Sequence, residues 1–331
     1  MNTKTLNYTS KDFVSDQEIR WCPGCGDFSI LKQVQNVLPK LEIEKEKIVF
    51  VSGIGCSSRF PYYMNTNGIH SIHGRAPALA TGLKLANPSL YIWVITGDGD
   101  ALSIGGNHFL HVFRRDINLN ILLFNNEIYG LTKGQYSPTS KINTISKTSP
   151  EGTIHSPLNP LFLALAAGAT FVGRSIDKEA KHLQECILQN ASHKGASLLE
   201  IYQNCHIFND GVFDNFTNKI SQKETIIFVE EGKPLLFGDG KALILEGFMP
   251  KIVNENDTDR SNLWIHDIED RNKALILSQL GYEGEFGHFP RVMGIMFRKE
   301  KKNLIKKTSQ NLVNIEFMEQ LIKGNDFLTK E

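Results

Sequence analysis

The chain has 331 residues, of which 41% are hydrophobic and 22% are charged, close to the averages of globular proteins, so the composition excludes a disordered or fibrous chain. Lysine and arginine together number 36, as do aspartate and glutamate, and this balance disfavours a general binder of nucleic acid or anionic lipid. Residues 1–20 lack the apolar core of a signal peptide. No apolar stretch reaches the roughly 20 residues of a membrane span, so we expect a cytoplasmic protein without a membrane segment.

Five short segments have the apolar, β-branched composition of buried strands, and segments with helical periodicity lie between them. Strands are predicted at 48–52, 90–96, 119–124, 170–174 and 197–202. Helices are predicted at 28–38, 77–86, 102–115 and 160–167, with a further helix that begins near Asp177. The alternation predicts a doubly wound, mostly parallel α/β sheet.

The alternation of strands and helices stops beyond Asn209. Residues 235–245 are typical of a hairpin, and we interpret Gly238-Asp239-Gly240 as its turn. The predicted organisation is therefore an α/β domain over residues 1–222 and a C-terminal extension over residues 223–331. Residues 126–159 are rich in glycine, serine, threonine and proline and too many for an ordinary connection, so we expect an ordered loop above a functional site.

Unusual residues follow four of the five predicted strands. Parallel strands place their carboxyl ends at one edge, and ligands of open α/β sheets bind in the crevice outside that edge. The first strand is followed by glycines and Cys56, the second by Gly97-Asp98-Gly99-Asp100, the third by Asn125-Asn126 and the fifth by Asn204-Cys205. The sequence thus predicts a functional site built from distant parts of the chain.

The sharpest pattern is Gly-Asp-Gly at 97–99, with Asn-Asn at 125–126, which resembles the thiamine diphosphate motif. One helix and one strand between them return the chain to the same edge, so Asp98 and Asn126 can face each other. Oxygen ligands of this kind suit Mg²⁺, and the resemblance adds the carbonyl of Ile128 as a third ligand. Backbone amides of Gly99 and Asp100, at the start of a helix, are predicted to bind the diphosphate.

Four of the five cysteines belong to the same edge. Cys22 and Cys25 form a Cys-x-x-Cys knuckle, and Cys56 and Cys205 each follow a predicted strand. Four thiolates can hold either a tetrahedral Zn²⁺ or a [4Fe-4S] cluster, and their spacing does not separate the two. A thioredoxin-like redox pair fits poorly, because the knuckle precedes the first strand. We interpret Cys186, on a predicted helix, as a small buried hydrophobe.

Taken together, these residues resemble the β subunit of the 2-oxoacid:ferredoxin oxidoreductases, particularly its 2-oxoglutarate branch. The resemblance covers about two hundred residues, up to Cys205, and the extension matches only loosely, through Gly-Lys-Pro (232–234) and Gly-Ile-Met-Phe-Arg (294–298). It rests on motifs that occur in order: Trp-Cys-Pro-Gly-Cys-Gly (21–26), Gly-Ile-Gly-Cys-Ser-Ser-Arg (53–59), His-Gly-Arg-Ala (73–76), Gly-Asp-Gly-Asp (97–100), Ser-Ile-Gly-Gly-Asn-His (103–108), Tyr-Gly-Leu-Thr-Lys-Gly-Gln (129–135) and Ser-Pro-Thr (137–139).

The resemblance implies a subunit that binds thiamine diphosphate with Mg²⁺, and a [4Fe-4S] cluster ligated by Cys22, Cys25, Cys56 and Cys205. It also implies cofactor contacts from seven residues: Ile54, Gly55, Cys56, Ser57, His73, Gly130 and Leu131. The implied reaction is the coenzyme A-dependent oxidative decarboxylation of a 2-oxoacid, with ferredoxin as the electron acceptor. 2-Oxoglutarate is the favoured substrate, and pyruvate or a broad range of 2-oxoacids is the alternative.

Such a reaction requires a carboxylate against the aminopyrimidine ring of thiamine, and in this family that glutamate belongs to a different domain. No second α/β domain is visible that could supply it, so an α subunit is predicted as an obligatory partner. Lys133, in the expected loop, is our hypothesis for binding a substrate carboxylate, and a solvated loop lysine is the alternative.

Two other classes of protein remain as alternatives. One is a zinc-stabilised structural subunit without catalytic activity. The other is a non-oxidative thiamine enzyme such as a decarboxylase, although those enzymes carry both cofactor domains in one longer chain and have no use for the cysteine set. Metal and sulfide analysis separates the first of these from an iron-sulfur enzyme.

Overall fold

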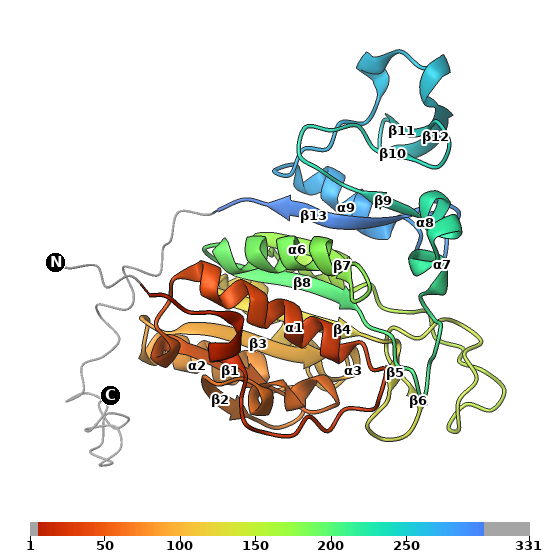
Figure 1. Ribbon diagram of the computed structural model, residues 1–331. Helices are drawn as coiled ribbons and strands as arrows, with labels where there is room; N and C mark the ends of the chain where they lie inside the picture. The colour runs from red at the N-terminus through yellow and green to blue at the C-terminus, as the bar shows by residue number, and fades with distance from the viewer. Residues whose placement is uncertain (1–5, 301–331) are drawn as a thin grey trace, which may run out of the picture. The chain divides into compact units, whose positions relative to one another are not determined.

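The structure of the protein is a computed structural model, in which residues 6–300 are described. Eight strands form the main sheet in the order β2-β1-β3-β4-β8-β7-β13-β9, with helices on both faces (Figure 1). Neighbouring strands are parallel except for β13, which runs antiparallel to β7. This confirms the predicted doubly wound, mostly parallel fold. Within residues 6–300, no helix has the length and apolar character needed to cross a membrane.

The five predicted strands are present, with shifts of one or two residues at their ends. They are β1 (Ile48–Ser52), β3 (Tyr91–Gly97), β4 (Leu119–Asn125), β7 (Phe171–Ile176) and β8 (Ala196–Tyr202). Every residue of β1, β4, β7 and β8 is buried, as expected for strands that helices cover on both faces.

Three strands of the main sheet were not predicted from the sequence: β2 (Asn67–His70), β9 (Ile226–Phe228) and β13 (Arg291–Arg298). All four residues of β2 are exposed at the edge, so β2 lacks the apolar signal of a strand. β9 and β13 come from the expected C-terminal extension and continue the sheet beyond β7. The boundary at residue 222 stays a prediction, and residues 301–331 of the extension lie outside the described residues.

The helices form two groups. α1 (Asp27–Val37) packs against α6 (Ala180–Ser192), and both lie in front of the sheet in Figure 1. On the opposite face, successive contacts join α2 (Ala76–Ala86), α4 (Gly106–Arg115), α5 (Pro160–Ala166) and α9 (Arg271–Gln279). Two short helices, α7 (Asp214–Thr217) and α8 (Lys219–Thr225), follow β8.

A core of buried side chains holds α1 and α6 to the sheet. Ile30 and Val34, four residues apart on α1, and Leu183 of α6 belong to one cluster with Phe50 of β1 and Trp93 of β3. Spacing of three and four residues places apolar side chains on one face of a helix. Each such side chain contributes roughly 1.5–3 kcal/mol when it is fully buried, so this core positions the strand ends that carry the site.

The predicted helix at 102–115 is wrong in its boundaries. The structure has a short helix α3 (Asp98–Leu102) and then α4 (Gly106–Arg115), with a break at Ser103, whose ψ is −104°. The break brings Gly105 against α3, where an added Cβ would lie 2.3 Å from the Asp100 carbonyl oxygen. Asp98 therefore begins a helix directly after β3.

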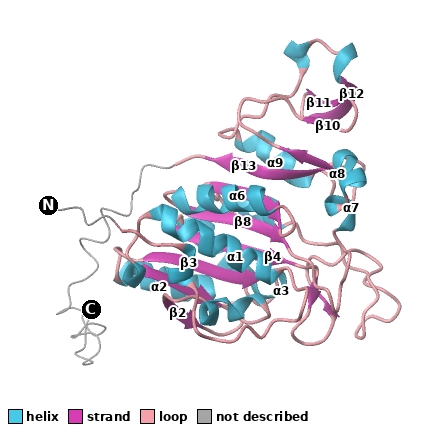
Figure 2. Ribbon diagram, viewed as in Figure 1, coloured by secondary structure: helices cyan, strands magenta, loops and turns pink. Residues whose placement is uncertain are grey.

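The predicted hairpin is confirmed. β10 (Leu236–Phe237) and β11 (Lys241–Glu246) are antiparallel, and β12 (Met249–Asn254) extends them to a separate three-stranded sheet (Figure 2). Gly238 and Gly240 have φ values of 56° and 69°, which glycine adopts without strain. The second Gly-Asp-Gly is thus a turn. The loop at 126–159 contains a small ribbon of β5 (Ile128–Tyr129) and β6 (Gln135–Tyr136).

Candidate functional site

A cavity of about 140 Å³, here called the first cavity, opens where β3 and β4 end. Its wall comes from five separate parts of the chain, which the sheet order brings together. The cavity is lined by all twelve residues that were predicted to hold thiamine diphosphate or its metal: Ile54, Gly55, Cys56, Ser57, His73, Asp98, Gly99, Asp100, Asn126, Ile128, Gly130 and Leu131. The strand topology accounts for their meeting, and their individual roles stay predictions.

Asp98 is held by the loop that was expected above the site. Its side chain is only 3% exposed. Its Oδ2 accepts hydrogen bonds from Ser137 Oγ at 2.5 Å and from Thr139 Oγ1 at 2.6 Å. Burial raises the pKa of Asp98 to about 6, and the two hydroxyl groups act in the opposite direction because they stabilise the carboxylate. The loop therefore fixes the orientation of this carboxylate.

Thr139 in turn belongs to a buried polar row that crosses three neighbouring strands. Its hydroxyl lies 2.9 Å from Asn125 Oδ1, and Asn125 Nδ2 donates to Glu200 Oε1 at 2.8 Å. Glu200 Oε2 accepts from Arg174 Nε at 2.6 Å, and both charged side chains are fully buried. Buried charges require such pairing. A glutamate and an arginine inside apolar strands were the signal in the sequence that could have identified this row.

The Asp100 side chain has a role that the sequence did not reveal, because only its backbone amide was predicted to act. Asp100 Oδ1 accepts from the amides of Ile54 at 3.0 Å and Gly74 at 2.7 Å, and lies 2.6 Å from His73 Nδ1. Thr96 Oγ1 donates to Oδ2 at 2.7 Å. One carboxylate thus ties together the two loops that were predicted to contact the cofactor.

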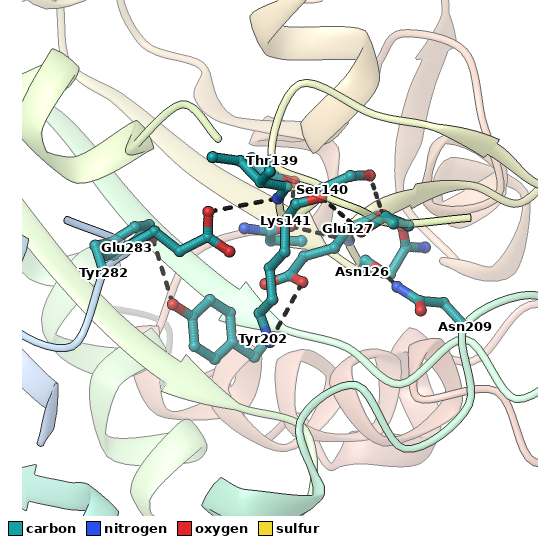
Figure 3. Close-up of polar contacts among 12 residues, drawn as sticks. Asn126, Glu127, Thr139, Ser140, Lys141, Tyr202, Asn209, Tyr282 and Glu283 are labelled. Carbon is teal, nitrogen blue, oxygen red and sulfur yellow. Dashed lines mark hydrogen bonds and ion pairs between the residues drawn. The ribbon is translucent and has the colours of Figure 1, made fainter. Parts of the chain in front are cut away.

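Asn126 and its neighbours are ordered by contacts with Asn209 and with Lys141, which belong to two other segments (Figure 3). Asn126 Oδ1 accepts from the Ile128 amide at 3.2 Å, and the Asn126 carbonyl accepts from Asn209 Nδ2 at 2.9 Å. Glu127 is in the left-handed region, with a φ of 55°, and faces Lys141 Nζ at 3.9 Å. These contacts confirm that the start of the expected loop is well packed.

A second cavity, of about 280 Å³, adjoins the first, and we call it the cysteine cavity. Cys22, Cys25, Cys56 and Cys205 all line it. Within the described residues, no three histidine, cysteine, aspartate or glutamate side chains are grouped so that they could hold a metal ion. The four thiols therefore border one space without meeting at a single point. Five residues line both cavities: Cys56, Asn126, Gly130, Leu131 and Gln203.

Local contacts explain how the cysteines come together. The Cys25 amide donates to the Cys22 carbonyl at 3.1 Å, which closes the knuckle, and Gly24 within it has a φ of 82°. Trp21 Nε1 donates to the Cys56 carbonyl at 2.7 Å. At Gly130, an added Cβ would lie 3.4 Å from Cys205 Sγ. The knuckle and the ends of two strands thus share one wall.

Three thiols of the cysteine cavity, those of Cys25, Cys56 and Cys205, are biased toward their protonated form. Burial raises the pKa of Cys56 to about 12 and also raises the pKa values of Cys25 and Cys205. For Cys25 and Cys56, the second cause is the negative charge of Asp27. Because thiolates are the form that binds metals, ligation at this cavity requires a cation that displaces the protons.

Two further residues singled out in the sequence, Lys133 and Cys186, differ in their position relative to the cavities. Lys133 is exposed and lines the cysteine cavity, but it is absent from the wall of the first cavity. Its proposed contact with substrate stays a prediction. Cys186 is 2% exposed on α6, with its Sγ 3.6 Å from His182 Nε2, and it lines neither cavity.

By sequence, the chain is similar to proteins that bind thiamine diphosphate or act on 2-oxoacids. The family model "Thiamine pyrophosphate enzyme, C-terminal TPP binding domain" matches residues 53–201. The chain is 54% identical to the 2-oxoglutarate oxidoreductase subunit KorB of Mycobacterium tuberculosis, over 82% of this chain and 73% of that relative. It is 45% identical to the 2-oxoacid:ferredoxin oxidoreductase subunit beta of Saccharolobus solfataricus, over 57% of this chain and 63% of that relative.

The structure is also similar to a solved one. A 2-oxoglutarate:ferredoxin oxidoreductase from Magnetococcus marinus, with 2-oxoglutarate, coenzyme A and succinyl-CoA bound, matches with a TM-score of 0.74 and 31% sequence identity. The match covers 99% of this chain and 95% of that chain. The likeness therefore includes β9 and β13, which the sequence patterns did not predict.

Proposed function

This chain belongs to the β subunits of the 2-oxoacid:ferredoxin oxidoreductases, and from this membership we propose the reaction that it supports. Together with an α subunit, it catalyses the coenzyme A-dependent oxidative decarboxylation of 2-oxoglutarate to succinyl-CoA and CO₂, and the electrons pass to ferredoxin. The observation that carries the proposal is that all the predicted thiamine diphosphate residues line one cavity, which shares a wall with the cysteine cavity.

The first cavity fits a metal-bound diphosphate. Gly55 has a φ of 131° and faces open space, so the backbone of this loop is accessible to a ligand. Asp98 and Asn126 supply oxygen ligands, which Mg²⁺ prefers. When bound, thiamine diphosphate supplies the electron sink that decarboxylation requires. The residues of this chain hold the metal, position the loops through Asp100, and supply backbone amides to the diphosphate.

The cysteine cavity fits a cluster better than a single ion. A tetrahedral zinc site needs four sulfurs at about 2.3 Å from one point, whereas the four thiols here line a cavity of about 280 Å³, and within the described residues no three of them are grouped for a single ion. We propose that Cys22, Cys25, Cys56 and Cys205 ligate a [4Fe-4S] cluster, which when bound supplies one-electron acceptance. The wall that both cavities share would keep the cluster close to the thiamine site.

The α subunit follows from what the first cavity does not contain. Among the residues that the structure describes, its only acidic side chains are Asp98 and Asp100, and no glutamate lines it. Hydroxyl groups already engage Asp98, and backbone amides and His73 engage Asp100. Neither carboxylate is available to face an aminopyrimidine ring. We propose that an α subunit supplies that glutamate.

The choice of 2-oxoacid is proposed from the names of the relatives and from one charge. Two of the similar proteins are named for 2-oxoglutarate, and one is named for 2-oxoacids in general. Lys133 is an exposed residue that lines the cysteine cavity, to which the shared wall also belongs. We propose that it binds the second carboxylate of 2-oxoglutarate, and a broad 2-oxoacid specificity is the alternative.

The test is co-expression of this chain with its candidate α subunit, followed by anaerobic purification. Ferredoxin reduction is then measured with 2-oxoglutarate, pyruvate and 2-oxobutyrate, with and without coenzyme A. We expect activity that depends on both subunits and on coenzyme A and is highest with 2-oxoglutarate. Activity of this chain alone would contradict the shared site, and a complex that binds one zinc and no sulfide would support the structural subunit instead.

A further inference from the structure

Gln203 joins the two cavities through a single side chain. It directly follows β8 and is only 1% exposed. It lines both the first cavity and the cysteine cavity. The sequence patterns pointed to Asn204 and Cys205 after this strand, and Gln203 was not among the predicted site residues.

Each polar atom of the Gln203 amide has a partner. Its Oε1 accepts from Asn126 Nδ2 at 2.9 Å. Its Nε2 donates to Cys25 Sγ at 3.3 Å and to the Asn204 carbonyl at 2.5 Å. An amide nitrogen has two protons to donate, and both are used. One amide therefore contacts a proposed metal ligand on one side and a proposed cluster ligand on the other.

Only one orientation of this amide satisfies all three contacts. A reversed amide would place its nitrogen against the nitrogen of Asn126 and its oxygen against the Asn204 carbonyl. Leaving buried polar groups unpaired in this way is unfavourable. The hydrogen-bond network thus assigns the oxygen of Gln203 to Asn126 and its nitrogen to Cys25.

The stem of Gln203 is also fixed. Its backbone amide donates to the Asn125 carbonyl at 2.9 Å, which extends the pairing of β4 with β8. A Cβ added at Gly26 would lie 3.0 Å from Gln203 Cγ, so the knuckle packs closely on the side chain. Gln203 cannot turn away from either partner without disturbing this packing.

The two contacts have different chemical effects. Because Asn126 Nδ2 is held by Gln203, the amide plane of Asn126 is set, and its Oδ1 is directed away from Gln203. Partners of this kind around metal ligands typically change metal affinity 10–100-fold when they are removed. A hydrogen bond to a cysteine sulfur withdraws charge from that ligand, and such bonds are among the factors that set the reduction potentials of iron-sulfur clusters.

We propose that Gln203 is a positioning residue that couples the two cavities: one amide orients Asn126 toward the diphosphate metal and raises the reduction potential of a cluster bound through Cys25. This inference rests on the proposed function. It extends that function by making the metal site and the electron acceptor dependent on the same side chain.

The test uses the complex with the α subunit, purified anaerobically, with Gln203→Met. Methionine has a similar length but can neither donate nor accept a strong hydrogen bond. We expect the cluster to become harder to reduce by about tenfold in equilibrium constant, equivalent to about 59 mV for one electron, in a redox titration followed by electron paramagnetic resonance. We also expect the Mg²⁺ concentration that half-saturates thiamine diphosphate binding to rise about tenfold.

A second variant separates the two contacts. Gln203→Glu keeps an acceptor for Asn126 Nδ2 but places no donor on Cys25 Sγ. We expect this variant to retain Mg²⁺ affinity near that of the unaltered complex, while its cluster is at least as hard to reduce as that of Gln203→Met. A loss of Mg²⁺ affinity equal to that of Gln203→Met would contradict the assigned orientation of the amide.

Gln222→Met is the matched control, because Gln222 is a half-buried glutamine whose amide is hydrogen-bonded to Glu179 and Phe216 and lines neither cavity. It should leave both the potential and the Mg²⁺ affinity unchanged. Equal effects of Gln203→Met and Gln222→Met would overturn this inference but not the proposed function. The same holds if Gln203→Met has no effect on a complex that contains both the cluster and thiamine diphosphate. An unaltered complex that holds neither cluster nor thiamine diphosphate would overturn the proposed function as well.

Discussion

A buried aspartate lies beside each cavity, and the two carboxylates differ in the hydrogen bonds that they receive. Asp98, at the first cavity, receives hydrogen bonds from Ser137 and Thr139. Asp27, beside the cysteine cavity, is 1% exposed, and its carboxylate lacks hydrogen bonds of the kind that Asp98 receives; the nearby Cys25 thiol only partly offsets the effect of burial on its pKa. Burial raises the pKa of Asp98 to about 6 and that of Asp27 to about 7.

This contrast extends to the residues around each aspartate. Asp98 is connected through Thr139 to the polar row, in which the charges of Glu200 and Arg174 are paired with each other. Around Asp27 stand thiols whose pKa values are raised by burial and by that same carboxylate. The first cavity is organised before any ligand binds, whereas thiols of the cysteine cavity must lose protons that burial and Asp27 favour before they can bind a cation. The following predictions test this difference.

The largest effect is expected from Cys205→Ser. Serine leaves only three of the four proposed thiolate ligands, so we expect ferredoxin reduction by the αβ complex to fall below detection and iron to fall well under about four per β chain. Thiamine diphosphate binding should persist, because Cys205 does not line the first cavity. Cys186→Ser, in a buried cysteine outside both cavities, should keep its iron. Normal iron content in Cys205→Ser would refute this ligand set.

The next largest effect is expected from Arg174→Met, which leaves Glu200 as an unpaired charge in the polar row. Breaking a buried pair in this way lowers the free energy of unfolding by about 3–5 kcal/mol, measurable by urea denaturation. Lys251→Met is the control, because Lys251 pairs with Glu246 on the surface and such pairs contribute about 0–1 kcal/mol. If both variants lower the free energy of unfolding by the same amount, the polar row does not organise the first cavity.

Thr139→Val tests whether the polar row serves the metal. The substitution removes the hydroxyl from Asp98 Oδ2 but keeps the shape of the side chain. We expect Mg²⁺ affinity, measured by metal-dependent binding of thiamine diphosphate, to fall 10–100-fold, and Thr139→Ser to restore most of it. Thr153→Val is the matched control, since Thr153 is equally buried in the same loop and its hydroxyl donates only to the Lys141 carbonyl. If the Mg²⁺ affinity of Thr139→Val is unchanged, the polar row does not contribute to metal binding.

The smallest effect is expected from Lys133→Ala. A partly exposed charge contact contributes up to roughly 1 kcal/mol, so the KM for 2-oxoglutarate should rise about fivefold, with little change for pyruvate. Lys147→Ala, in an exposed lysine of the same loop, should change neither. Equal increases for both substrates would reject a role for Lys133 in specificity.

The placement of Asp98 and Asn126 on the wall of one cavity could be predicted because it follows from topology: a parallel sheet returns successive strand ends to one edge. The partners of Asp98 could not, because no periodicity shows where Ser137 and Thr139 of an irregular loop will fold back. Gln203 could not be predicted as a site residue for a similar reason, because a single polar residue after a strand forms no recognisable sequence motif. β13 was missed because it joins the sheet from the far end of the chain, and its pairing with β7 is a tertiary event.

The measurement that tests the two-cavity arrangement most directly is a structure of the αβ complex, purified anaerobically with thiamine diphosphate and Mg²⁺ and recorded with anomalous scattering at the iron edge. We predict a diphosphate and its metal at Asp98, Asn126 and Ile128, and an iron signal bordered by Cys22, Cys25, Cys56 and Cys205. A diphosphate bound elsewhere, or a single zinc ion among the cysteines, would contradict it.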